Sequence, residues 1–207
     1  MMCANLDCIK EEVRRIDQAG CDIFHCDIMD GNYVPNMALS PFDVSCIKAN
    51  TKKPVDVHLM VKNPDLISNI FLKIGVDIIY FHPETSLDVE GLIKKIRTSN
   101  AHPGLAINPE VTVESVYQYL HLIDYLLVMS VKPGFAGQTY ITAITEKIKQ
   151  LIDLKHKFDY KIIVDGGITD EKIRELSSLG TDGFVLGTSV LFGKGDYSQV
   201  CSYVREL

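Results

Sequence analysis

The amino-acid sequence predicts a single α/β domain in which parallel strands, each followed by a helix, close into a (β/α)8 barrel. Three observations predict this fold class. Short apolar segments recur along the whole chain, and amphipathic sequence of helix length separates each one from the next. No linker, charge run or low-complexity segment interrupts the repeat, so residues 1–207 are expected to form one domain. The hydrophobic content of 46% is sufficient for one well-buried core.

Seven strands can be placed from their apolar residues and from the turn signals that flank them. Helix-length connections between them favour parallel pairing, because antiparallel hairpins need only short turns. The strands are expected at 22–27, 55–60, 77–82, 104–108, 125–130, 161–165 and 183–187.

Helix boundaries are also visible in the sequence. Polar N-cap residues stand before a proline or an acidic residue of a first turn, and glycines stand where helix C-caps belong. The predicted N-caps and their first helical residues are Ser40-Pro41, Asn63-Pro64 and Thr169-Asp170, and the predicted C-terminal glycines are Gly20, Gly75 and Gly180.

The eighth strand has little sequence available. A helix-like stretch at 6–19 precedes the strand at 22–27, so the remaining strand must lie within residues 1–5. This is shorter than the usual five or six strand residues. We therefore expect a truncated or stub first strand, or a natural chain that begins upstream. A doubly wound open sheet is the alternative fold, but no G-x-G-x-x-G follows an early strand.

Charge and composition exclude several classes of function. The net charge is −6 and no cluster of lysines and arginines occurs, so the chain offers no electrostatic footprint for nucleic acid or an anionic membrane. Neither an 18-residue apolar run nor a secretory signal is present, which predicts a cytoplasmic protein. The six cysteines show no C-x-x-C spacing and are expected to be reduced thiols.

Polar residues stand at the carboxyl ends of otherwise apolar strands, and a barrel of this kind has its active site at these ends. His25 and Asp27 share one face of their strand because side chains alternate. Alone, this pair could be a core histidine followed by the start of a turn. Together with His58 and Asp165, it matches the ligands of a zinc or iron site. The remaining strand-end residues are His82, Asn108 and Ser130, of which His82 is expected in a pocket wall or hydrogen-bond network.

Glycine-rich segments follow the last three strands, where this fold commonly binds phosphate. Glycines let backbone N–H groups approach an anion, and short helices that start there would aim their positive ends at it. These neutral donors are compatible with an acidic chain. The predicted phosphate-binding residues are Gly134, Phe135, Ala136, Gly137, Gly166, Gly167, Gly187, Thr188 and Ser189.

Five motifs extend these segments: H-C-D-I-M-D-G-N-Y-V-P-N at 25–36, D-V-H-L-M-V at 56–61, V-M-S-V-K-P-G-F-A-G-Q at 128–138, V-D-G-G-I at 164–168 and L-G-T-S at 186–189. In these motifs the chain resembles the ribulose-phosphate 3-epimerase family, over residues 6–207. The resemblance implies a TIM barrel of the ribulose-phosphate-binding type. It also implies a homo-oligomeric isomerase that interconverts D-ribulose 5-phosphate and D-xylulose 5-phosphate.

The resemblance further assigns roles to individual residues. It implies one divalent ion, zinc first with iron, manganese or cobalt as substitutes, held by His25, Asp27, His58 and Asp165. Asp27 and Asp165 would also be the two bases that transfer a proton at C3 through a metal-stabilised enediolate. Met29, Met60 and Met129 would lie beside the reacting carbons of the ketose phosphate, although their spacing alone would place them in the core.

Other functions remain open at this stage. The segments 38–41, 82–85 and 187–189 resemble the branch that acts on D-allulose 6-phosphate. The family's substrate-contacting serine, on its first strand, would fall just before Met1, so a degenerate sugar-phosphate-binding barrel without activity is a further alternative. A decarboxylase or lyase would need a lysine at a strand end, and Asp56-Val57-His58 offers no Asp-x-Lys.

Overall fold

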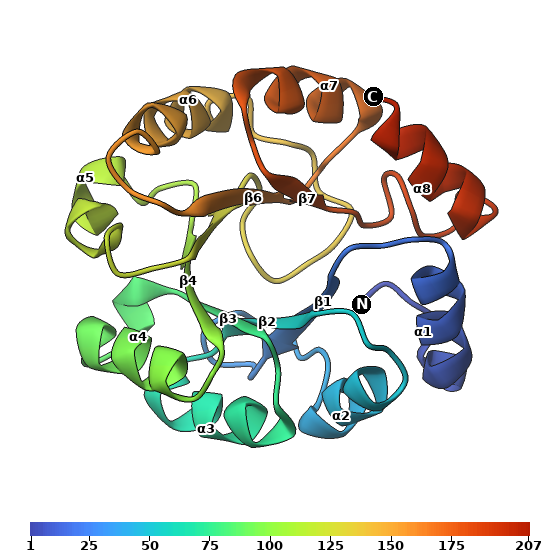
Figure 1. Cartoon of the computed structure of the whole chain (residues 1–207), viewed down its shortest axis with the longest axis horizontal. Helices are drawn as coiled ribbons and strands as arrows, with labels where there is room; N and C mark the ends of the chain where they lie inside the picture. Colours follow the sequence, from blue (N-terminus) through green and yellow to red (C-terminus); the bar gives the residue numbers. More distant parts are fainter.

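The computed structural model describes residues 1–207 and contains one curved sheet of seven parallel strands, with helices around its outer side (Figure 1). The strand order follows the chain from β1 to β7, which confirms the barrel-like repeat of βα units. The strands are β1 Phe24–Met29, β2 Val55–Met60, β3 Ile78–Phe81, β4 His102–Ile107, β5 Tyr125–Met129, β6 Lys161–Asp165 and β7 Gly183–Val185.

The helices that cover the sheet begin and end largely where the sequence predicts. The hydroxyl of Ser40, the amide oxygen of Asn63 and the hydroxyl of Thr169 each accept a backbone N–H of the first turn. Gly75 and Gly180 end their helices in the left-handed conformation. The α-helices are α1 Ile9–Gln18, α2 Pro41–Ala49, α3 Pro64–Ile74, α4 Val89–Thr98, α5 Val113–Val116, α6 Ile144–Leu154, α7 Asp170–Leu179 and α8 Tyr197–Arg205.

Two predicted strands have the observed bounds, β2 and β6, and the others differ by one or two residues at one or both ends. Strand β1 starts at Phe24 and extends to Met29, because Ile28 and Met29 continue the ladder with β2. Strand β4 begins at His102, which pairs with Ile78 of β3. Strand β7 ends at Val185, two residues early, and it has a neighbouring strand on one side only.

The predicted stub strand is wrong. Residues 1–5 form a turn in which the N–H of Ala4 donates to the carbonyl of Met1, and Asn5 then caps a short 3-10 helix at Leu6–Cys8. These local hydrogen bonds curl the segment, so no strand pairs with the free edge of β1 or of β7. From this segment the Met1 ammonium group reaches the edge of β1, where it donates to the carbonyl of His25.

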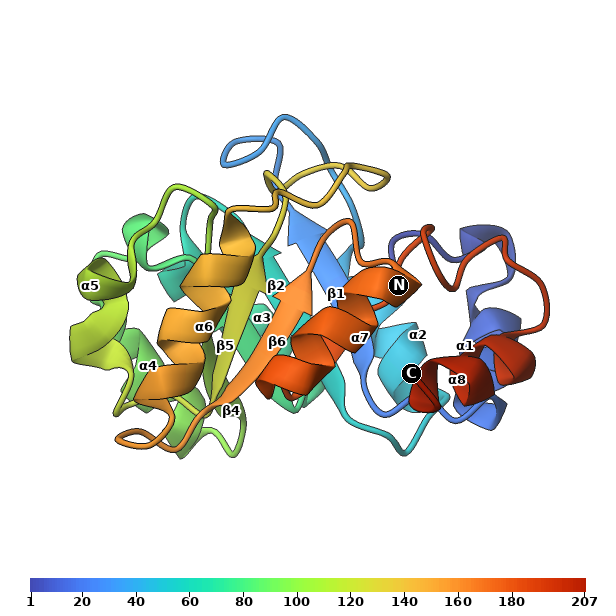
Figure 2. The ribbon, with the colours of Figure 1, turned by 90° about the horizontal axis from the view of Figure 1, so that it is seen from above.

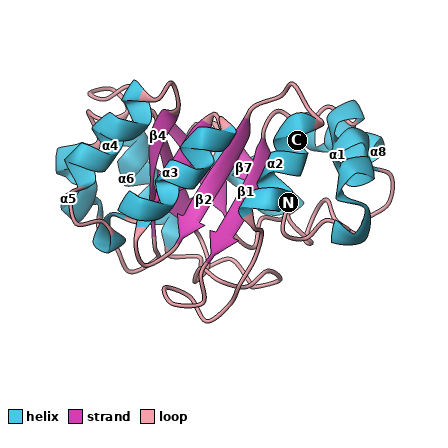
Figure 3. Cartoon of the chain, turned by 90° about the horizontal axis from the view of Figure 1, so that it is seen from below, coloured by secondary structure: helices cyan, strands magenta, loops and turns pink.

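The gap between β7 and β1, called the seam below, is closed on its outer side by α1 and α8, which lie side by side (Figures 1 and 3). The Tyr197 hydroxyl of α8 donates to Glu12 of α1 at 2.7 Å, and Arg15 lies 4.8 Å above the Tyr197 ring. The Arg205 guanidinium contacts Asp22 at 2.7 Å. Side chains therefore connect the two ends of the chain across the seam.

The curved sheet has apolar residues on both faces. The main core lies between the strands and the surrounding helices and includes Phe24, Leu59 and Ile162. A smaller cluster centred on Tyr80 and Leu127 fills the inside of the curve. Because side chains alternate along a strand, every second residue of each strand points to this inner face. None of the helices is long and apolar enough to cross a membrane.

Candidate metal centre and active site

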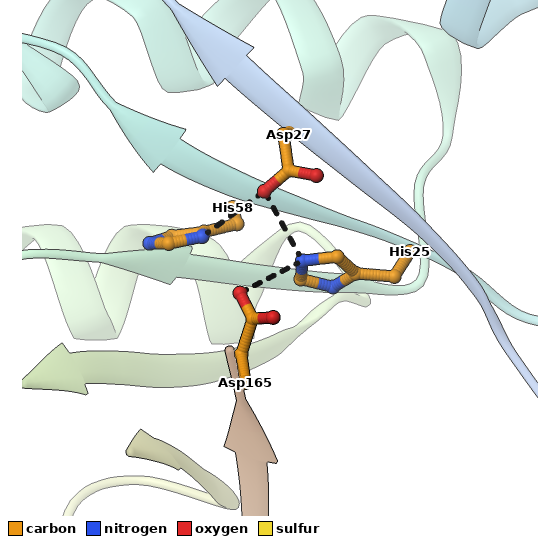
Figure 4. A group of neighbouring side chains, drawn as sticks. All are labelled: His25, Asp27, His58 and Asp165. Carbon is orange, nitrogen blue, oxygen red and sulfur yellow. Dashed lines mark ion pairs between the residues drawn. The ribbon is translucent and has the colours of Figure 1, made fainter. Parts of the chain in front are cut away.

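Four polar side chains gather on the inner face of the sheet (Figure 4): His25 and Asp27 of β1, His58 of β2 and Asp165 of β6. One nitrogen or oxygen atom from each lies within 4.8 Å of the others. His25 Nε2 is 3.5 Å from Asp27 Oδ1 and 3.9 Å from Asp165 Oδ2, while His58 Nδ1 is 3.5 Å from Asp27 Oδ1. Asp27 and His58 are register partners, and the curvature of the sheet brings Asp165 opposite them.

This four-residue cluster could hold a divalent cation. His25 Nε2 and His58 Nδ1 are buried and have no hydrogen-bond partner, which is unusual for polar atoms in a protein interior. Both nitrogens face the carboxylate oxygens of the cluster (Figure 4). Two imidazoles and two carboxylates form a donor set that suits zinc, iron or manganese. The residues present therefore fit the kind of ion predicted from the sequence.

The two carboxyl groups have very different pKa values without a metal. Burial acts to raise the pKa of Asp27, but the charge of His25 and the close approach of the His25 and His58 rings hold it well below the usual range. Burial raises the pKa of Asp165 to about 7, opposed by His25 and reinforced by Asp27. Burial lowers the pKa of His58. In His25, burial is outweighed by Asp56 and Asp27, which raise the pKa well above its ordinary value.

A stability measurement checks the raised pKa of Asp165. The unfolded carboxyl group loses its proton near pH 4, whereas the folded group keeps it until about pH 7. Between these values the folded state binds more protons, so the free energy of unfolding falls as the pH rises and then levels off. We expect metal-free Asp165→Asn to have a larger free energy of unfolding in urea than the wild type. The difference should grow between pH 4 and 7 to a few kcal/mol.

The comparison variant for this measurement is Asp27→Asn. Because the folded pKa of Asp27 is lowered, its charge stabilises the fold above pH 4, and its removal should destabilise the protein there. A difference between Asp165→Asn and the wild type that does not change with pH would contradict the proposed origin of the effect.

Main-chain contacts at the end of β6 fix the position of Asp165. The buried hydroxyl of Ser130 donates to the carbonyls of Asp165 and Gly166, and the Ser130 N–H also reaches the Asp165 carbonyl at 2.8 Å. Gly167 has φ +62°, and a Cβ there would lie 2.4 Å from the backbone nitrogen of Tyr140. Only glycine fits this close approach of two loops.

A cavity open to solvent begins at Asp27 and Asp165 and extends toward the carboxyl ends of β5, β6 and β7. It brings together every residue predicted to contact substrate or phosphate. These lining residues are Met29, Met60, Met129, Gly134, Phe135, Ala136, Gly137, Gly166, Gly167, Gly187, Thr188 and Ser189.

The glycine-rich loops do not start short helices as predicted. After β5, an extended loop runs to α6 at Ile144, and it is tied to the loop after β1 by the amide of Asn36, which donates to the Gly134 carbonyl at 2.7 Å (Figure 2). After Gly187 the chain forms a hydrogen-bonded turn instead of a helix. Only α7 begins close to such a loop, three residues after Gly167. Anion binding would therefore use mainly free backbone N–H groups in loops.

The model of the ribulose-phosphate 3-epimerase family matches residues 1–191, which is most of the chain. The chain belongs to this family. The ribulose-phosphate 3-epimerase of Methanocaldococcus jannaschii is 36% identical over all of this chain and 88% of its own length. That of Escherichia coli is 36% identical over 94% of this chain and 88% of its own length. The Bacillus subtilis ribulose-phosphate 3-epimerase is 32% identical over 99% of this chain and 95% of its own.

Solved structures of other enzymes share the fold of this epimerase-family chain. The 3-keto-L-gulonate-6-phosphate decarboxylase of Vibrio cholerae has a TM-score of 0.70 over 96% of this chain and 91% of its own, at 17% identity. The phosphoribosyl anthranilate isomerase of Thermus thermophilus has a TM-score of 0.69 over 95% of this chain and 94% of its own, at 13% identity. These likenesses support the barrel-like architecture alone.

Residues around the epimerase-family cluster include two that sequence reasoning missed, Asp56 and Glu84. Asp56 Oδ1 lies 2.6 Å from His25 Nδ1, and Glu84 accepts hydrogen bonds from Tyr33 and Asn108. Asp56 could have been found, because it stands two residues before His58 and so shares its face of β2. Glu84 follows β3 in a 3-10 turn and carried no such signal.

Proposed function

We propose that the chain is a metal-dependent ketose-phosphate 3-epimerase that interconverts D-ribulose 5-phosphate and D-xylulose 5-phosphate. The observation that carries the proposal is the pair of carboxylates, Asp27 and Asp165, which line one cavity from separate strands. Family membership and the names of the relatives support the same reaction.

Epimerisation at C3 removes a proton from one face of the sugar carbon and returns a proton to the opposite face. A single base would have to move across the substrate, whereas two bases on different strands can each serve one face. Asp27 comes from β1 and Asp165 from β6, and Ser130 holds the latter by its main chain. In this assignment one carboxylate accepts the proton while the other, protonated, delivers it, and the roles reverse for the reverse reaction.

The four-residue cluster is proposed to bind one divalent cation, with zinc as the first candidate and iron, manganese or cobalt as substitutes. His25 and His58 would contribute neutral nitrogens, and Asp27 and Asp165 would contribute oxygens. When bound, such an ion supplies positive charge that stabilises the enediolate oxygens of the substrate. Entry of the ion would displace the proton that His25 otherwise carries among the carboxylates.

The far part of the cavity is proposed to bind the phosphate group. Gly134, Gly166 and Gly167 have positive φ angles. Because glycine has no side chain, an anion can approach their N–H groups closely. Phosphate anchoring would orient C3 between the two carboxylates. Met29, Met60 and Met129 line the same cavity, and their thioethers give the reacting carbons a polarisable wall that takes no part in proton transfer.

A solvent-labelling experiment tests the proposal directly. The zinc-supplemented chain is given D-ribulose 5-phosphate or D-allulose 6-phosphate in D2O, and NMR follows deuterium at C3 of substrate and product. We expect turnover and C3 labelling with the pentulose phosphate, since proton exchange with a solvent-accessible carboxyl group accompanies two-base transfer. Labelling only with the hexulose phosphate would assign the chain to the other branch. No labelling with either sugar would leave a binding protein.

The homo-oligomer and the cytoplasmic location stay predictions. A surface suited to self-association lies at the starts of α2 and α3, where Phe42 is 86% exposed and Leu66 is 62% exposed. Leu87, 94% exposed, is held beside α3 because its N–H donates to Asp65. Exposed apolar side chains of this size, where they form one patch, are typical of subunit contacts.

A further inference from the structure

Each histidine of the cluster uses one ring nitrogen toward the cluster and turns the other toward a second buried group. His25 faces Asp27 and Asp165 through Nε2, and His58 faces Asp27 through Nδ1 (Figure 4). A neutral imidazole has one N–H and one lone pair, and only the lone pair can bind a cation. The proton on the outer nitrogen therefore decides whether the inner nitrogen can serve as a ligand.

For His25, the outer nitrogen faces a carboxylate. Its Nδ1 lies 2.6 Å from Oδ1 of Asp56, a side chain on β2 that is 4% exposed. The contact is short, but its angle departs from that of a good hydrogen bond, so electrostatic attraction is its main component. A lone pair at this distance from a carboxylate oxygen would be repelled, whereas an N–H is attracted. Asp56 thus keeps a proton on Nδ1, whatever the charge of the ring, and leaves Nε2 for the cluster.

For His58, the outer nitrogen faces a second histidine. His58 Nε2 and His82 Nε2 are 2.9 Å apart, so one of them must carry a proton and the other must accept it. Both rings are fully buried, and the two nitrogens are in direct contact. The choice depends on the carboxylates that face the other two ring nitrogens, Asp27 at 3.5 Å from Nδ1 of His58 and Glu84 at 3.6 Å from Nδ1 of His82.

The carboxylate of Glu84 faces His82 Nδ1, with Oε1 at 3.6 Å. Hydrogen bonds from the Tyr33 hydroxyl at 2.7 Å and the Asn108 amide at 2.9 Å orient this carboxylate. Its charge favours a proton on Nδ1 of His82, which makes Nε2 of His82 an acceptor. Asp27 favours the opposite arrangement, but its carboxylate also faces His25 Nε2 at 3.5 Å, and the charge of His25 offsets its pull on His58. His58 is therefore expected to donate from Nε2 and to keep the Nδ1 lone pair for the cluster.

We propose that Asp56, and the His82–Glu84 pair, are positioning residues that fix the tautomers of His25 and His58 so that both inner lone pairs face one cation site. The inference rests on the metal role proposed for the cluster. The two arrangements share a design in which an outer carboxylate orients a ligand histidine, and groups of this kind commonly raise metal affinity.

The first test measures tautomers in the metal-free protein. Long-range 1H–15N correlation spectra of histidine-labelled wild type distinguish the two nitrogens of each ring. We expect a proton on Nε2 of His58, on Nδ1 of His82 and on Nδ1 of His25. A His58 ring protonated on Nδ1 alone, or a His25 ring without a proton on Nδ1, would overturn the proposal. This measurement requires neither a variant nor activity.

The second test measures zinc affinity by calorimetry with two matched pairs of variants. Asp56→Leu and His82→Phe remove the outer partner while keeping bulk, and both should weaken zinc binding by about 10–100-fold. Asp56→Asn and His82→Gln retain an oxygen that can accept the histidine proton, and their affinities should stay much closer to that of the wild type. Equal affinities within each pair would overturn the positioning role.

The outcome for this inference is separable from that for the proposed function. A wild type that binds zinc with the expected tautomers but does not epimerise a sugar phosphate would contradict the function and retain the inference. If the wild type turns over substrate but Asp56→Leu and His82→Phe bind zinc as tightly as it does, the function is retained and the positioning role is contradicted.

Discussion

Asp165→Asn is expected to lower the turnover number for D-ribulose 5-phosphate by a factor on the order of 10³ or more, while the protein stays folded. The amide that replaces the carboxyl group can neither accept nor deliver the proton at C3. The fold should persist because Ser130 contacts the main chain at this position, and Asn is nearly the same size as Asp. The same variant should be more stable than the wild type without metal, so lost activity would not reflect unfolding.

Steady-state kinetics with a coupled assay measure this effect, with kcat separated from KM. Asp159→Asn is the matched control, because Asp159 is exposed and precedes β6 at the opposite end of the same strand. The control should retain wild-type kinetics. Turnover by Asp165→Asn close to that of the wild type would remove Asp165 from the proton transfer and contradict the two-base proposal.

Removal of divalent metal by dialysis against a chelator is expected to abolish epimerisation, and stoichiometric zinc should restore it. A carboxylate with a pKa near 4 is too weak to ionise a carbon acid unaided. Zinc lowers the pKa of a bound water from 15.7 to about 7, equivalent to about 12 kcal/mol of anion stabilisation. No single hydrogen bond in the cavity could replace a contribution of this size.

Metal content by mass spectrometry, measured on the same samples as activity, checks the result. Manganese, cobalt or iron should also restore turnover, whereas magnesium should restore little, because it prefers an all-oxygen octahedron to two imidazoles. Full activity in a sample with far less than one metal ion per chain would contradict a metal-dependent mechanism.

Much of the fold and the four-residue cluster could be predicted from the sequence, because both depend on local patterns. The recurrence of short apolar segments located seven strands, and the alternation of side chains along a strand put His25 and Asp27 on one face. The strands of a barrel converge, so His58 and Asp165 could be assigned to the same site from the amino-acid sequence alone. The cavity also brings together the glycines predicted from the loops and the methionines that the family resemblance implied.

The features that could not be predicted depend on competing local bonds or on distant contacts. The turn at Met1–Ala4 and the cap at Asn5 outweigh a short extended segment. The contact between Asp56 and His25 requires the register of β1 and β2, and the contacts of Glu84 join residues far apart in the chain, Tyr33 among them. No periodicity encodes such pairs.

The seam between β7 and β1 has a consequence for how the molecule opens. Every ladder joins strands that are neighbours in the chain, so no backbone hydrogen bond of the sheet connects its first and last strands. The two ends are connected instead by side chains of α8, among them Tyr197 on Glu12 and Arg205 on Asp22. We therefore expect the last helix to detach in a local fluctuation that leaves the sheet intact, as a unit of cooperativity separate from the strands.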